Sequence, residues 1–103
     1  MFTVVNVNRP LENNDVRVYV GRPSVLGNPF KLGKDGDRQE VIAKYRRWLW
    51  EEIKKRERVY KELVGLVEFE RHASDIQLAC HCYPQACHAD ILVKALEWLK
   101  TQV

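Results

Sequence analysis

The segment from Arg38 to about His72 most constrains the fold of this 103-residue chain, because its apolar residues recur at helical spacing. The residues that keep this period are Val41, Tyr45, Trp48, Leu49, Ile53, Val59, Leu63 and Leu66 or Val67. The segment separates two stretches rich in β-branched residues, and such a crossover is long enough to join parallel neighbours in a sheet. We therefore expect one helix from Arg38 to the mid-50s, then a second helix or a bent continuation.

The remaining segments complete an α/β pattern. Residues 2–7, 16–20 and 76–80 are predicted strands, and residues 90–101 are a predicted closing helix. The predicted order is strand, strand, helix, helix, strand, helix, which makes a small sheet of about three strands with helices packed on it. We expect residues 1–103 to form a single domain. Ligands gather at the carboxyl ends of strands in such sheets, and two unusual loops, 21–30 and 81–88, follow strand ends.

Composition narrows the classes of function. A formal charge of +3 permits an anionic ligand without requiring nucleic acid. No apolar run approaches the roughly 20 residues that span a bilayer, so no membrane role is expected. The start, MFTVVNVNRP, lacks the pattern of a secretion signal, and three cysteines cannot all pair within one chain. We expect a cytoplasmic, reducing setting.

The stretch ACHCYPQACHAD, residues 79–90, gathers all three cysteines of the chain. Cys80 and Cys82 would project to one side if the strand continues, and Pro84 would shape a turn that returns Cys87. Cys80, Cys82, Cys87 and His88 are therefore predicted metal ligands, with zinc the default ion. Because the side chains of adjacent residues rarely point the same way, the fourth ligand stays open between His88 and His81. If only the cysteines bind, the fourth position is open for water or substrate.

Two other interpretations of this cluster stay open. Cys87 and His88 precede the last helix, whose N-terminus favours a thiolate, so they are candidate catalytic residues of an enzyme with a cysteine nucleophile. The cysteines can instead be small buried core residues. The sequence does exclude familiar alternatives, because it lacks the Glu of a zinc deaminase, a C-x-x-C motif, a dinucleotide-binding glycine motif and a phosphate-binding loop of the G-x-x-x-x-G-K type.

The loop GRPSVLGNPF, residues 21–30, is the second candidate site. Arg22 and Ser24 suit an anion, Asn28 can recognise an amide or base edge, and Phe30 can stack on a ring. These features predict a pocket for a small anionic or nucleotide-like ligand. The alternative is a rigid structural loop in which Asn28 caps a turn and Phe30 lies in the core.

A basic stretch from Lys44 to Lys61 holds eight Lys or Arg residues against three Glu. We expect a solvated helix face there, and nucleic-acid binding is not favoured without an exposed aromatic residue or a groove beside the charge. Trp50, which falls outside the apolar stripe, is the only obvious aromatic candidate. It is either a partly covered residue at the flank of the core or a contact to a partner chain.

Two blocks of the sequence resemble the domain-of-unknown-function family 4326 of bacteria and phages. VYVGRPSVLGNPF (18–30) is similar to the family's strand and Gly-Asn-Pro-Phe loop, and LACHCYPQACHADIL (78–92) is similar to its Leu-x-Cys-x-Cys-x-Pro-x-x-Cys-His signature. His81 departs from the pattern, which has an aromatic residue there. The resemblance implies one fold and one shared site but no reaction. Carried over by position, the site residues are Gly27, Asn28, Pro29, Cys80, Cys82, Cys87 and His88.

The sequence therefore predicts a small α/β protein with a zinc-binding Cys/His site beside a pocket for an anionic or nucleotide-like ligand. One alternative is an enzyme that uses Cys87 and His88, or an open metal site that activates water. The other is an interaction module, in which zinc only stabilises the fold and the basic stretch or Trp50 meets a partner.

Overall fold

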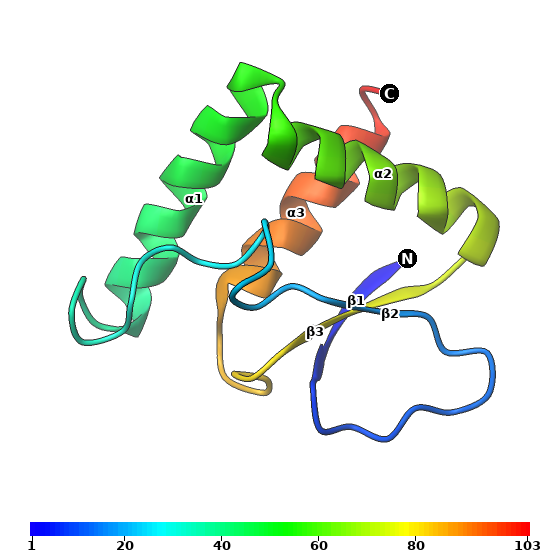
Figure 1. The fold of residues 1–103 in the computed structure, drawn as a ribbon, viewed down its shortest axis with the longest axis horizontal. Helices are drawn as coiled ribbons and strands as arrows, with labels where there is room; N and C mark the ends of the chain where they lie inside the picture. The colour runs from blue at the N-terminus through cyan, green and yellow to red at the C-terminus, as the bar shows by residue number, and fades with distance from the viewer.

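The computed structural model describes all 103 residues and contains one parallel sheet of three strands (Figure 1). Strand β3 (Ile76–Cys80) lies at the centre, between β1 (Phe2–Asn6) and β2 (Arg17–Tyr19). Both pairings are parallel. Backbone bonds continue beyond the short strand β2, because the Gln77 N–H donates to Val16 O and the Val20 N–H donates to Ala79 O. The predicted order of elements and the parallel pairing of β2 with β3 are confirmed.

Alternate residues of the strands face the helices. Phe2, Ile76, Leu78 and Cys80 are buried on this face and belong to the main hydrophobic cluster of the protein. The opposite face of the sheet is more polar, and there the Arg17 Nε–H donates to the Gln77 side chain at 3.0 Å. The core therefore lies between one face of the sheet and the helices.

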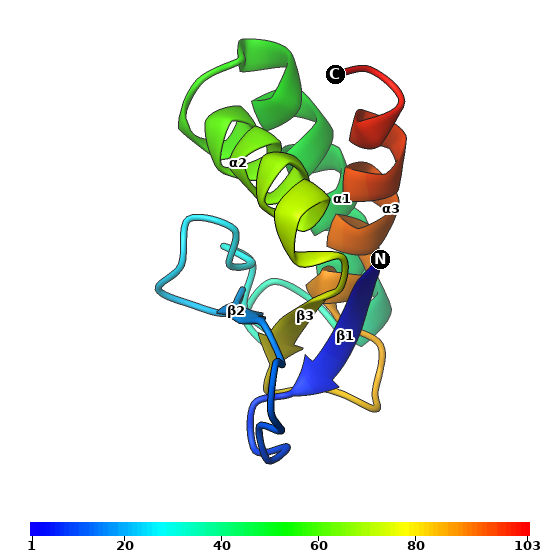
Figure 2. The same ribbon diagram turned by 90° about the vertical axis from the view of Figure 1, so that its right-hand side faces the viewer.

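Three helices contribute the rest of this core: α1 (Arg38–Lys55), α2 (Arg58–Ala73) and α3 (His88–Lys100). Helix α3 packs against β1, β3 and both other helices (Figure 2). Arg56 ends α1 in a left-handed conformation, with φ at 55°, so α2 is a separate helix rather than a bent continuation. None of the helices has both the length and the apolar character that crossing a membrane requires.

Helix α3 begins two residues earlier than the sequence analysis expected. Cys87 is its N-cap, and the Asp90 carboxylate accepts a hydrogen bond from the Cys87 N–H at 3.0 Å. Asp90 thus lies in the first turn as part of a capping box, instead of opening the helix. As a consequence, His88 is the first residue of the helix, and the helical backbone sets the direction in which its side chain leaves the chain.

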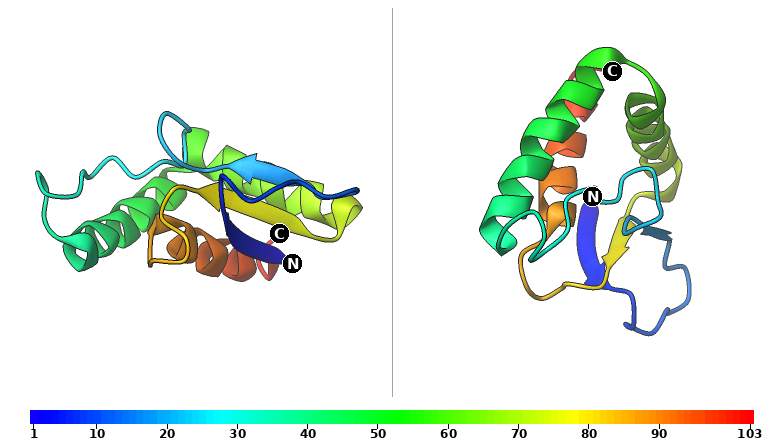
Figure 3. Two further views of the ribbon diagram at one scale, coloured as in Figure 1. Left: turned by 90° about the horizontal axis from the view of Figure 1, so that it is seen from below. Right: turned by 60° about the vertical axis from the view of Figure 1, so that its left-hand side comes forward.

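Tyr45 attaches the long loop after β2 to helix α1. Its side chain is fully buried, and its hydroxyl donates a hydrogen bond to Leu26 O at 2.7 Å. Burial, and next the nearby Cys87, raise the pKa of Tyr45, so the hydroxyl keeps its proton. Figure 3 shows this loop running from β2 to α1, while the loop after β3 leaves the same edge of the sheet.

We expect Tyr45→Phe to lower the free energy of unfolding by about 1–3 kcal/mol, because the buried Leu26 carbonyl would lose its partner. Urea denaturation measures the change. Tyr60→Phe is the matched control, since the Tyr60 hydroxyl accepts only an exposed bond from Arg56 at 3.3 Å. Equal stability of the two variants would show that Tyr45 does not anchor the loop.

Candidate functional site

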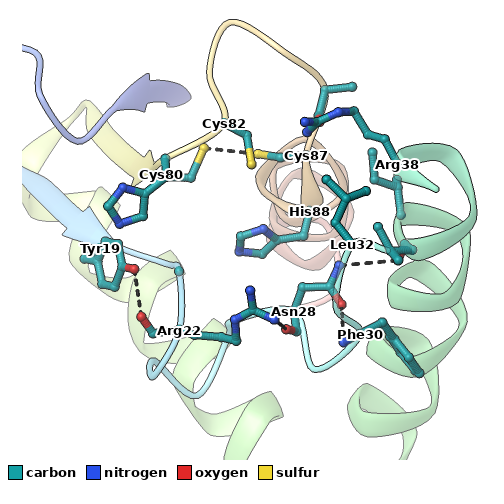
Figure 4. Close-up of a pocket in the computed structure, with 15 residues that line it drawn as sticks. Tyr19, Arg22, Asn28, Phe30, Leu32, Arg38, Cys80, Cys82, Cys87 and His88 are labelled. Atoms are coloured by element: carbon teal, nitrogen blue, oxygen red, sulfur yellow. Dashed lines mark hydrogen bonds between the residues drawn. The ribbon is translucent and has the colours of Figure 1, made fainter. Parts of the chain in front are cut away.

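A pocket of about 350 Å³ lies at the carboxyl ends of β2 and β3 (Figure 4). It is bounded by the loop after β2, the first turns of α1 and α3, and the loop after β3. Among the residues expected from the sequence, those that line it are Arg22, Asn28, Phe30, Cys80, His81, Cys82, Cys87 and His88. Ser24, Gly27 and Pro29 are outside the lining. The two loops singled out by sequence therefore build one pocket.

Two polar side chains of the 21–30 loop, those of Ser24 and Asn28, hold it in shape. The Ser24 hydroxyl accepts a hydrogen bond from the Leu26 N–H at 3.1 Å. The Asn28 carbonyl oxygen accepts one from the Phe30 N–H at 2.9 Å, and its amide nitrogen donates to Val41 O at 3.3 Å. Both the oxygen and the nitrogen of the Asn28 side chain thus bond within the protein. This agrees with the alternative interpretation, in which Asn28 caps a turn of a rigid loop.

Gly27 brings the loop close to its own beginning. A Cβ atom at this position would lie 3.0 Å from the backbone nitrogen of Arg22. Because backbone atoms are its nearest neighbours, a side chain here would displace the loop that carries Arg22. Gly27 therefore contributes to the site by close packing, without lining the pocket.

Both charged residues of the pocket are arginines. The Arg22 Nη1–H donates a long bond to Asn28 O at 3.4 Å, and the Arg38 Nη1–H donates to Ala86 O at 3.0 Å. Neither guanidinium has a carboxylate partner, and no Asp or Glu lines the pocket. The electrostatic character of the pocket is therefore cationic.

The sequence analysis missed Arg38, which is the first residue of α1. The predicted topology could have indicated that Arg38 lies near the site. The chain leaves β2 at the carboxyl edge of the sheet and enters α1 after one loop, so the first turn of α1 can return to that edge. Tyr19 and Leu32 were missed as well, and both line the pocket.

Cys80 and Cys87 lie side by side at the inner wall of the pocket. Their sulfur atoms are 3.1 Å apart, both side chains are buried, and all three cysteines are free thiols. Burial, and then the hydrogen bond with Cys80, raise the pKa of the Cys87 thiol. In this arrangement the position of Cys87 at a helix N-terminus does not make it a thiolate.

The loop after β3 is held by the end of strand β1. The Asn6 amide donates to Tyr83 O at 2.9 Å, and the Val7 N–H donates to Cys80 O at 2.9 Å. Cys82 is half-buried and lines the pocket. His81 is exposed and packs edge-on against Tyr19, with ring centroids 5.8 Å apart. Asn6 was not expected from the sequence, which gives no local sign that it would reach residue 83.

His88 is buried, and its Nε2 lies 2.7 Å from Val20 O. Burial lowers the pKa of His88, so the ring is neutral and its Nε2–H donates to the Val20 carbonyl. Tyr45 packs edge-on against the ring with centroids 5.1 Å apart. The second ring nitrogen, Nδ1, has no protein partner and carries a lone pair. His88 can therefore accept a hydrogen bond or a proton from a pocket ligand.

The residues predicted as zinc ligands do not surround a common point in the structure. No group of three or more His, Cys, Asp or Glu side chains is gathered at distances that hold a metal ion. Tetrahedral zinc with bonds of about 2.3 Å requires sulfur atoms about 3.8 Å apart, whereas Cys80 and Cys87 are 3.1 Å apart. The Nε2 of His88 is engaged by Val20. These side chains therefore do not form a tetrahedral zinc site.

We expect Cys82 to react with iodoacetamide at neutral pH well before Cys80 and Cys87, because it is the only one of the three that is not buried. Peptide mass spectrometry at successive times gives the rate at each position. Cys82→Ser should remove the fast reaction and leave the slow ones unchanged. Selective early labelling of Cys87 would contradict this ranking and support a nucleophilic Cys87.

The fold and pocket define a small α/β protein with a cationic site at the carboxyl edge of a parallel sheet. The chain belongs to the family described as Domain of unknown function (DUF4326), whose sequence profile matches residues 5–98. The match includes both pocket-forming loops and all three helices, except for the last residues of α3. No curated protein and no solved structure matches the chain.

Proposed function

We propose that this protein binds a small phosphorylated, nucleotide-like molecule in the pocket at the carboxyl ends of β2 and β3. The observation that carries the proposal is that Arg22 and Arg38 are the only charged residues of the pocket and lack carboxylate partners. A guanidinium offers a planar fork of donors that matches phosphate oxygens. Two such groups on opposite segments of the wall suit a ligand with more than one negative charge.

The rest of the pocket suits the ring of a nucleotide-like ligand. Phe30, Tyr19 and His81 supply aromatic surface from three segments, and Leu32 and Ile42 add aliphatic surface. A volume of about 350 Å³ lies within the usual range for small-molecule sites, about 300–1,000 Å³. Apolar walls with a few polar groups are typical of such sites. The arginines would then hold the anionic part and the aromatic residues the ring.

His88 would supply the principal acceptor in this pocket. Because its Nε2–H is used by Val20, its Nδ1 is the atom available to a ligand. A neutral imidazole in a fixed tautomer distinguishes a ligand donor from an acceptor. The same nitrogen could take a proton in a reaction, which is how the enzyme alternative would use His88. Asn28 would act by shaping the loop rather than by recognising a base.

We expect the protein to bind ADP or AMP more tightly than adenosine, with the difference lost in Arg22→Gln and Arg38→Gln. Each substitution should weaken nucleotide binding about tenfold or more, because it removes a charge-assisted hydrogen bond. Isothermal titration calorimetry measures the affinities, with inorganic phosphate as a further probe. Guanosine, cytidine and uridine nucleotides are tested in the same way.

Arg47→Gln is the matched control, since Arg47 is an exposed arginine of α1 outside the pocket. It should bind like the unmodified protein. The proposal is wrong if no nucleotide or phosphate binds, or if Arg47→Gln weakens binding as much as the two pocket substitutions.

Zinc binding by Cys80, Cys82 and Cys87 is the second candidate, in a cytoplasmic, reducing setting that suits three free thiols. It is favoured by the adjacent sulfur atoms of Cys80 and Cys87 and by the position of Cys82 on the same pocket. Binding would require the two buried sulfur atoms to move apart and Cys82 to turn toward them. His88 or His81 would be the fourth ligand, or that position would stay open.

If this second candidate is right, elemental mass spectrometry of the untagged protein should find about one zinc ion per chain, and less in Cys80→Ser and Cys87→Ser. His72→Ala is the control, because His72 is exposed on α2. Protein that contains no zinc and takes up none when zinc is supplied would rule out the metal site while leaving the phosphate pocket untouched.

A further inference from the structure

Two tryptophans meet at the surface between helices α1 and α3. Trp50 of α1 and Trp98 of α3 pack edge to face, with ring centroids 5.0 Å apart. Trp50 is partly buried against the core, whereas Trp98 is 42% exposed. In the sequence, Trp50 was the only obvious aromatic candidate beside the basic stretch, and the fold adds Trp98 from the last helix.

A groove of about 280 Å³ adjoins this pair, between α1 and α3. Arg46 and Trp50 line it from α1, and Ile91, Lys94 and Ala95 line it from α3. The two α1 residues belong to one row of the helix surface, because Arg46 and Trp50 are four positions apart. The groove thus combines an apolar floor, two cations and an aromatic end.

The two cations of the groove are free of carboxylates, unlike several other cations of the same helices. Lys54, Lys55 and Lys100 form ion pairs with Glu residues, and the Lys44 ammonium donates to Asp35 O at 2.6 Å. Arg46 and Lys94 form no ion pair, and no acidic residue lines the groove. Asp90 lies one turn before Lys94, but its carboxylate caps α3 through the Cys87 N–H. The charge that remains in the groove favours an anionic partner.

We propose that the α1–α3 groove binds single-stranded nucleic acid, with a base against Trp98 and phosphates at Arg46 and Lys94. Single-strand sites combine cations that follow the backbone with aromatic rings on which bases stack. Here the groove supplies the cations, and Trp98, which packs against Trp50 beside the groove, supplies the ring. The proposal does not depend on a ligand in the pocket, because none of the groove residues lines that pocket.

A second copy of the chain fits this surface less well. A symmetric dimer formed through the groove would place Arg46 and Lys94 opposite the same cations of the other subunit. An acidic peptide could satisfy the charges, but it would use the exposed part of Trp98 only if it also carried an aromatic or apolar residue. The combination of free cations and an exposed indole therefore favours nucleic acid.

The test measures fluorescence anisotropy of short fluorescein-labelled oligothymidylate and oligouridylate at several salt concentrations. Trp98→Ala should weaken binding about tenfold, the loss expected for one base stacked on an aromatic ring. Arg46→Gln and Lys94→Gln should each reduce the slope of log affinity against log salt by about 0.7, because each removes one phosphate contact. Trp98→Phe should restore much of the binding lost in Trp98→Ala.

Two controls separate the groove from the rest of the surface. Phe69→Ala removes an exposed aromatic residue of α2, and Arg47→Gln removes an exposed cation beside the row, so both should bind as the unmodified protein does. Absence of binding at low salt, or equal losses in the controls, would overturn the proposal. So would tighter binding of an oligoglutamate peptide than of the oligonucleotides, or a dimer in sedimentation that Trp98→Ala dissociates. Far-UV circular dichroism checks that each variant is folded.

Discussion

The parallel pairing of β3 with both of its neighbours is the constraint on which the site depends. In a parallel sheet all strands end at one edge, so the segments that follow them are brought together however far apart they lie in sequence. The Val20 N–H donates to Ala79 O at 3.0 Å and the Val7 N–H donates to Cys80 O at 2.9 Å, which extends this alignment past the strands themselves. The 21–30 loop and the 81–88 loop meet for this reason.

Burial divides the pocket into two chemically different parts. Its inner wall contains the buried Cys80, Cys87 and His88, and burial favours the uncharged forms of Cys87 and His88. Its charged groups are the exposed Arg22 and the half-buried Arg38, which retain access to solvent. A ligand with a charged end and a neutral ring fits this division better than a compact ion does.

The helices could be predicted because their apolar residues recur at helical spacing, as Tyr45 and Leu49 show for α1, and the strands because they are short runs rich in β-branched residues. The start of α3 was placed late, because Cys87 is an unusual N-cap and the decisive contact is its bond to Asp90. Arg38 could be assigned to the site only through the topology. The hydrogen bond from the Asn6 amide to Tyr83 O joins residues that are 77 positions apart, and no local sequence pattern predicts such a contact.

The roles of loop residues were harder to predict than their positions. Asn28 and Ser24 carry polar groups that suit a ligand, but the same groups satisfy the backbone of their own loop. A sequence gives the donors and acceptors without stating which are already used. The cysteines illustrate the same limit, since their spacing suits a metal while the fold brings only two of the sulfur atoms into contact.

The internal bonding of the 21–30 loop has a consequence for the rate and entropy of ligand binding. The Ser24 N–H donates to Gly21 O at 2.8 Å, the Gly27 N–H donates to Ser24 O at 2.9 Å, and Asn28 closes the next turn. The conformational entropy of this segment is thus lost when the protein folds, before any ligand arrives. A molecule entering the pocket meets a preorganised surface, so its affinity is not reduced by the ordering of a flexible loop.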